Sequence, residues 1–191
     1  MPKWLQSRKV RLVICCLALC IGVYVLLVAL APVYMPSHQP KVVTQKLKKP
    51  PKTKENRLYI PAIGVDVAIV EGNTEAVLEK GAWHRRPENG NPEKGGNFIL
   101  SAHRFKMGVT PGQTKSKSPF YHLDKLKSGD EILVDYNSKR YEYKITRKYK
   151  VDRYAVSIES PSKDAKMTLY SCDLRGEQAG REGIEATPVI P

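Results

Sequence analysis

The chain has 191 residues, which is enough for one ordinary domain with a sizeable core and some accessory segments. Its net charge of +13 is unevenly placed, because residues 1–54 hold ten of the 32 Lys and Arg residues and none of the 19 Asp and Glu residues. The positive and negative charges of residues 55–191 are therefore nearly balanced. Because the basic excess lies outside the part expected to fold, we expect no nucleic-acid partner.

Residues 12–31, LVICCLALCIGVYVLLVALA, contain no charged side chain. About twenty apolar residues are what a helix needs to cross a bilayer, so this run predicts a transmembrane anchor. A cleaved signal peptide is the alternative, because Ala29 and Ala31 form a small-x-small site after a basic start. The length of the run and Pro32, which would follow the cut, favour the anchor.

Charged residues on the two sides of this run predict its orientation. The N-terminal flank, residues 1–11, carries Lys3, Arg8, Lys9 and Arg11, and the other flank has no charge until Lys41. The positive-inside rule places residues 1–11 in the cytoplasm and the folded part outside, on a single-pass membrane protein. The lysines at 41, 46, 48 and 49 oppose this orientation, since they lie within the window that the rule counts.

Residues 32–54 are rich in Pro and Lys and show no periodic apolar pattern. Such a composition is typical of an extended spacer, which would hold a folded domain at residues 55–191 clear of the membrane.

Short apolar runs separated by turn residues begin at Leu58 and predict a strand-rich domain. We expect strands at residues 57–60, 65–70, 97–102, 131–136, 140–151, 166–172 and 183–190. Residues 137–139 predict a tight hairpin turn, residues 73–80 a short helix capped by Asn73, and Ser118-Pro119 the start of a helical turn. Gly and Pro clusters predict loops at residues 87–96 and 108–119. The sum is a mainly β, mostly antiparallel domain with a few short helices, which closes into a barrel because that removes unpaired edges.

Cysteine placement gives the sharpest functional signal. Three of the four cysteines, Cys15, Cys16 and Cys20, lie in the predicted anchor, so Cys172 is the only thiol of the outer domain. It ends a predicted strand and precedes a polar loop, as a reactive nucleophile would. The alternative is a buried cysteine that acts as a small apolar residue.

A nucleophilic thiol needs a base, and the chain has four histidines. His103 follows the apolar run Phe98-Ile99-Leu100 and is presented at a strand end, like Cys172. His38 lies in the spacer, and His84 and His122 lie in segments where an exposed histidine without a catalytic role is expected.

Acyl transfer also needs positive charge or hydrogen-bond donors where the oxyanion develops. Both Arg175 and Arg181 follow Cys172 closely. Arg181 begins the last predicted strand and can return beside Cys172, whereas Arg175 falls within the connecting loop, so Arg181 is favoured.

Residues 58–186 resemble the sortases of Gram-positive bacterial surfaces. The similar segments are LYIPAIGVDVAIVEG, GGNFILSAHR, FYHLDKLKSGDEI and TLYSC, the last resembling the family motif TLxTC, and Arg181 stands nine positions after Cys172. Two departures are Ser171, where the family usually has Thr, and Glu182-Gly183, which is less apolar than the family's closing strand.

The resemblance implies a closed eight-stranded β-barrel and a cysteine transpeptidase. Cys172 would attack a backbone carbonyl of an LPxTG-like sorting peptide, His103 would protonate the leaving amine, and Arg181 would bind the oxyanion or the peptide. It also implies substrate contacts from Ser171, Leu169 and Ala102. The acceptor would be an amine of a wall precursor or a pilin lysine, and no metal or organic cofactor is implied.

Two other functions are compatible with parts of this pattern. One is a non-catalytic, membrane-tethered β-barrel that binds peptide or wall polymer. The other is a papain-like hydrolase, which is disfavoured because such enzymes place the cysteine early and the histidine late.

Overall fold

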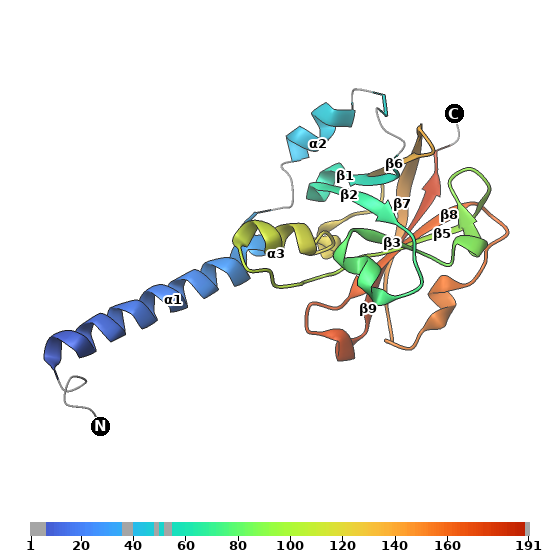
Figure 1. The fold of residues 1–191 in the computed structure, drawn as a ribbon. Helices are drawn as coiled ribbons and strands as arrows, with labels where there is room; N and C mark the ends of the chain where they lie inside the picture. Colours follow the sequence, from blue (N-terminus) through green and yellow to red (C-terminus); the bar gives the residue numbers. More distant parts are fainter. Residues whose placement is uncertain (1–6, 36–39, 48–49, 52–54, 190–191) are drawn as a thin grey trace.

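The computed structural model describes residues 7–35, 40–47, 50–51 and 55–189. Its centre is a β-barrel in which neighbouring strands follow the order β3-β2-β1-β6-β7-β9-β8-β5, and pairing of β3 with β5 closes the ring (Figure 1). The strands are β1 (Arg57–Ile60), β2 (Val65–Val70), β3 (Ala82–Arg85), β4 (Gly90–Asn91), β5 (Gly95–Ser101), β6 (Glu131–Tyr136), β7 (Lys139–Val151), β8 (Lys166–Cys172) and β9 (Arg181–Pro188). The predicted closed eight-stranded barrel is confirmed, and β4 is a short addition beside β5.

Most neighbouring strands are antiparallel, as predicted, and two pairs are parallel: β2 with β3, and β5 with β8. Parallel neighbours end at the same edge of a sheet. The segments that follow β5 and β8 therefore leave the barrel side by side.

Seven of the nine strands in the described residues were predicted from the sequence. The bounds of β1, β2, β6 and β8 are those predicted, and β5, β7 and β9 differ by a few residues, with residue 190 outside the described part. Strands β3 and β4 were not predicted, and β4 lies in a segment expected to be a loop. The predicted turn between β6 and β7 is a two-residue hairpin in which Asn137 and Ser138 have φ of 49° and 66°, the left-handed conformation that such turns require.

The helices differ more from the predictions. Residues 75–79 form a 3₁₀ helix, shorter than the helix expected at 73–80. Helix α3 (Pro111–Lys117) occupies most of a predicted loop and ends at Ser118. The local reason is Thr110, whose Oγ1 accepts a hydrogen bond from Gln113 N at 3.2 Å, followed by Pro111 at the first helical position. The helical turn predicted to start at Ser118-Pro119 is present, because the Ser118 carbonyl accepts a hydrogen bond from Tyr121 N at 3.1 Å. The short 3₁₀ helices are η2 (Pro61–Ile63), η3 (Glu75–Glu79), η4 (Pro87–Asn89), η5 (Leu123–Lys125), η6 (Val156–Glu159) and η7 (Glu177–Ala179).

Helix α1 (Arg8–Tyr34) contains the apolar run and is long and apolar enough to cross a membrane. It projects away from the barrel, and its C-terminal end packs against α3 (Figure 1). Residues 12–27 are exposed, whereas Val28, Ala31 and Pro32 are buried.

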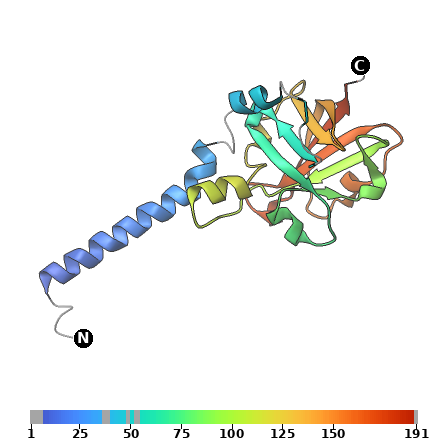
Figure 2. The ribbon, with the colours of Figure 1, turned by 45° about the horizontal axis from the view of Figure 1, so that its top comes forward.

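Helix α2 (Pro40–Leu47) corrects the expectation that residues 32–54 are extended throughout. It lies against the barrel on the side of β1 and β2 (Figure 2). Val43 is buried with Tyr59 and Leu133, and the partly buried Leu47 packs against them, because two apolar residues of this helix meet an apolar patch on the outer face of the barrel. The composition of residues 32–54 did not predict this contact, because Tyr59 and Leu133 lie outside that segment.

Two apolar clusters position the site. The main cluster fills the barrel and includes Phe98, Leu100 and Leu169. A second cluster lies on the outer face of β5 and β8, where Ile99 and Tyr170 pack against Ile158 of η6. The connection between β7 and β8 therefore covers the outer face of these two strands.

Candidate active site

The topology brings the three predicted catalytic residues into one cavity. Ser101 of β5 is opposite Tyr170 of β8, so the residues that follow these positions emerge at one edge. On the other side of β8, Arg181 of β9 is directly opposite Cys172. The thiol, His103 and Arg181 all line a cavity of about 370 Å³.

Side-chain alternation along β8 decides which neighbours share this cavity. Successive side chains of a strand point to opposite faces, so Tyr170 and Cys172 face outward and line the cavity. Leu169 is wholly buried in the barrel core, and Ser171 Oγ donates a hydrogen bond to the Ala102 carbonyl at 2.6 Å. Of the three residues expected to contact substrate, the structure places Ala102 on the cavity wall and places Leu169 and Ser171 behind it.

The Cys172 side chain is exposed at the end of β8. This position contradicts the alternative of a buried, apolar cysteine. The remaining cysteines, at 15, 16 and 20, all lie in α1, far along the chain from the cavity.

His103 is partly exposed, and its Nε2 atom lies 3.3 Å from Glu79 Oε1. Burial lowers the pKa of His103, and the nearby Lys106 lowers it further, whereas the Glu79 carboxylate opposes the shift. Hydrogen bonds from Lys117 and Lys106 lower the pKa of Glu79 to about 2. Glu79 is therefore a fixed negative charge beside the imidazole at every physiological pH.

Replacing Glu79 by glutamine is expected to lower the pKa of His103 further, because the substitution removes the charge that favours the imidazolium. The imidazole C–H signals followed by NMR between pH 4 and 9 give this pKa directly. Lys106→Gln is the matched control, and it should move the pKa upward because a like charge is removed. An upward shift in Glu79→Gln would contradict the assigned electrostatics.

The structure distinguishes the two candidate arginines. The Arg181 guanidinium lies 5.1 Å from the centre of the Tyr170 ring and lines the cavity. The Arg175 side chain is 73% exposed and pairs with Asp173 at 3.0 Å, away from the cavity wall. Gly180 has φ of +101°, and a Cβ there would lie 2.5 Å from the Val151 carbonyl oxygen. A glycine at 180 thus lets the chain turn closely past β7 and start β9 with Arg181.

A buried ion pair joins the segments that carry His103 and Arg181. Arg104 Nη2 lies 3.0 Å from Glu182 Oε2 and 2.7 Å from Asp124 Oδ1. Arg104 and Glu182 are both buried, and each directly follows one of the cavity residues. Glu182, the polar residue noted in the last strand, therefore has a structural role: it compensates the charge of Arg104, which would be costly to bury alone.

Sequence reasoning missed the wall formed by β3. Trp83 and Arg85 line the cavity, with the Arg85 guanidinium 4.1 Å from the Trp83 ring. Arg85 Nε donates to Glu159 Oε1 at 2.9 Å, and the Tyr170 hydroxyl donates to the same carboxylate. Burial alone would raise the pKa of Glu159, but these hydrogen bonds outweigh it and lower the pKa. Ala82-Trp83-His84-Arg85 places two apolar residues before two polar ones, so the segment has no apolar–polar alternation that would have predicted a strand.

The other described histidines are buried, contrary to the expectation that they are exposed. His84 is held between Glu71 and the Gly90 carbonyl, at 3.1 Å from each. Burial lowers the pKa of His122. Neither lines the cavity with Cys172, and His38 lies outside the described residues.

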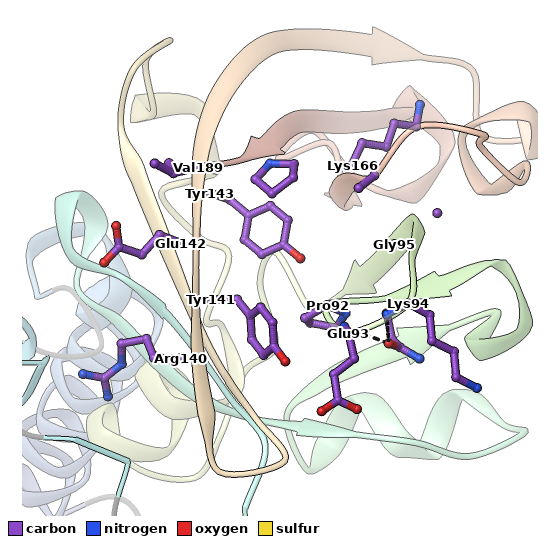
Figure 3. A pocket seen from close by; sticks show the side chains of 14 residues that line it. Pro92, Glu93, Lys94, Gly95, Arg140, Tyr141, Glu142, Tyr143, Lys166 and Val189 are labelled. Atoms are coloured by element: carbon purple, nitrogen blue, oxygen red, sulfur yellow. Dashed lines mark hydrogen bonds between the residues drawn. The ribbon is translucent and has the colours of Figure 1, made fainter. Parts of the chain in front are cut away.

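A second cavity, of about 660 Å³, lies between β7 and the turn that joins β4 to β5 (Figure 3). Tyr141 and Tyr143 face it from β7, with Glu93 and Lys94 on the other side (Figure 3). Its described lining contains neither cysteine nor histidine. Lys166 in this lining pairs with Glu185 at 3.3 Å, and Arg140 pairs with Asp135 at 2.7 Å. The lining therefore offers no thiol and imidazole pair of the kind found in the first cavity.

Fold and site together define a closed eight-stranded β-barrel with a thiol, an imidazole and a guanidinium on one cavity wall. The sortase domain family matches residues 58–189, and the chain belongs to the sortase family. It is 28% identical over 124 residues to Sortase A of Listeria monocytogenes, covering 65% of this chain and 51% of the relative. It is 32% identical over 119 residues to Sortase A of Bacillus anthracis, covering 61% and 50%. The chain thus spans about half the length of these curated relatives.

A solved structure of the Clostridium perfringens Sortase D5 transpeptidase superposes with a TM-score of 0.60 at 22% identity, covering 78% of this chain and 88% of that one. This likeness concerns the fold. The family membership and the fold confirm the resemblance found in the sequence.

Proposed function

We propose that the protein is a membrane-anchored cysteine transpeptidase that cleaves an LPxTG-like sorting peptide and transfers the acyl part to an amine. The observation that carries this proposal is that Cys172, His103 and Arg181 line one cavity at the C-terminal ends of β5 and β8. Thiol, imidazole and guanidinium are the groups that two successive acyl transfers require.

In the first step the Cys172 thiolate attacks the scissile carbonyl carbon and forms a C–S bond. The oxygen becomes negatively charged, and Arg181 stabilises it. As the C–N bond breaks, the His103 imidazolium donates its proton to the leaving amine, and a thioester remains on Cys172. In the second step neutral His103 accepts a proton from the incoming amine, whose nitrogen attacks the thioester carbon. A new C–N bond forms, the C–S bond breaks, and Cys172 is released as the thiolate beside the His103 imidazolium, as at the start.

Acid and base roles for His103 fit its surroundings. Burial lowers its pKa, which favours the neutral base, and the Glu79 carboxylate opposes that shift and favours the imidazolium. A proton can then be donated in one step and accepted in the next.

Helix α1 would anchor the protein, with the N-terminus in the cytoplasm and the barrel outside on a single-pass chain. Support comes from its length and apolar composition and from the basic residues that precede it. Sorting signals of surface proteins would be the substrates, and a wall precursor or a pilin lysine would supply the amine.

Mass spectrometry of reaction products tests the proposal. The full chain in proteoliposomes is incubated with a library of sorting-like peptides and a set of candidate amines. We expect one peptide class to be cleaved and to appear joined to an amine through a new amide bond. Binding without cleavage would favour the non-catalytic barrel, and cleavage that gives only free acids in the presence of amines would favour a hydrolase.

A further inference from the structure

The segment between β5 and α3, residues 102–110, exposes three apolar side chains in alternation. Phe105, Met107 and Val109 are exposed, the last at 76%, and Lys106 and Gly108 separate them. We call this segment the β5–α3 loop. Large apolar side chains gathered on one exposed loop are typical of a surface that contacts another apolar phase.

Polar side chains of α3 and of Ser118, which ends it, hold the backbone of this loop. The amides of Lys106, Gly108 and Val109 donate hydrogen bonds of 2.9 Å each. Their acceptors are Ser118 Oγ, Thr114 Oγ1 and Gln113 Oε1. Backbone donors that are satisfied within the protein can enter a region poor in water without losing hydrogen bonds.

The loop also touches α1. Tyr24 of α1 donates a hydrogen bond from its hydroxyl to the Val109 carbonyl at 3.0 Å, and α1 packs against α3. If α1 spans a membrane, Val109 lies at the level of a residue within the apolar run. Tyrosine is favoured where such a run meets the headgroups, because its ring is apolar and its hydroxyl is polar.

The length of α1 also indicates that its end beside α3 lies near the membrane surface. Every residue from 12 to 27, the apolar part of α1 that precedes its first buried residue Val28, is exposed. At about 1.5 Å per residue this part measures roughly 24 Å, whereas the hydrocarbon core of a bilayer is about 30 Å thick. The end of α1 that packs against α3 must therefore approach or enter the bilayer, and it brings the β5–α3 loop with it.

We propose that the β5–α3 loop inserts Phe105, Met107 and Val109 into the interfacial region of the bilayer that α1 crosses. The proposal rests on the anchor part of the proposed function. Lys106, Lys115 and Lys117 lie on the loop and on α3. Lys106 and Lys117 share the single carboxylate of Glu79, so this group of side chains keeps a net positive charge that suits the anionic headgroups of a membrane surface. Because His103 immediately precedes the exposed residues, insertion fixes the height of the catalytic cavity above the bilayer.

Nitroxide accessibility in the full chain tests this contact. In a background with Cys15, Cys16, Cys20 and Cys172 replaced by alanine, Val109→Cys carries a spin label in proteoliposomes containing phosphatidylglycerol. Val156→Cys is the matched control, because Val156 is 78% exposed and lies on η6, away from α1 (Figure 1). Power saturation compares accessibility to oxygen, which concentrates in lipid, with accessibility to a water-soluble nickel chelate.

We expect the oxygen-to-nickel accessibility ratio to be several-fold higher at position 109 than at position 156. A ratio at 109 equal to that at 156 overturns the proposal, and so does low accessibility to both reagents, which would mean that protein covers the loop. A label at Leu19→Cys separates the two levels of failure. A lipid-like ratio at 19 with an aqueous one at 109 refutes only the loop contact, whereas aqueous ratios at both refute the anchor as well.

Discussion

Replacing Cys172 by alanine is expected to abolish peptide cleavage and amine transfer, with a loss of about 10⁴-fold or more, as when a nucleophile is removed. The sulfur atom is the group that would carry the acyl chain between the two steps, and the described cavity lining offers no other thiol. Because the Cys172 side chain is exposed, the free energy of unfolding should change by no more than about 0.5 kcal/mol. Transfer of a labelled peptide measures the rate, and thermal unfolding measures the stability.

The three cysteines of α1 provide a matched control for this substitution. Replacing Cys15, Cys16 and Cys20 together by alanine should leave transfer unchanged, because they are remote from the cavity. A thiosulfonate reagent should also inactivate this triple variant as fast as the original protein, since Cys172 is retained. Appreciable transfer by Cys172→Ala would assign the chemistry to another residue.

The fold was predictable where a strand carries its own pattern. Strand β8 alternates core and outward residues over its length, and its predicted bounds hold. Strand β3 has only four residues, and its partners β2 and β5 lie elsewhere in the chain, so pairing rather than local sequence makes it a strand. Helix α3 was missed because Pro111 and Gly112 suggested a loop, although Thr110 and Pro111 also match a helix start.

In the candidate site, the sequence predicted the residues that line the cavity better than the residues that hold them in place. Cys172 ends one recognisable strand and His103 follows another, so both reach the same cavity because β5 and β8 are parallel neighbours. The inward positions of Leu169 and Ser171 could have been predicted, because each is an odd number of residues from the outward-facing Cys172. Contacts between Glu79 and His103, and between Arg104 and Glu182, join segments that are far apart in the chain and meet only in the folded barrel.

Arg181 is the residue whose replacement should cost most after Cys172. Arg181→Ala is expected to lower kcat by roughly 10²–10³-fold, the usual cost of losing a group that stabilises an oxyanion. Arg181→Lys should recover only part of that loss, because an ammonium keeps the charge but not the forked donors of a guanidinium.

Arg175→Ala is the matched control, since it removes the same side chain six residues earlier in the chain. Arg175 pairs with Asp173 on the exposed side of the loop, so its loss should leave kcat almost unchanged. Steady-state kinetics on one peptide and one amine separate kcat from KM for each variant. If Arg175→Ala lost more activity than Arg181→Ala, the oxyanion role would have to move to Arg175. The loop from Asp173 to Gly180 would then have to rearrange when substrate binds, because this structure holds Arg175 outside the cavity.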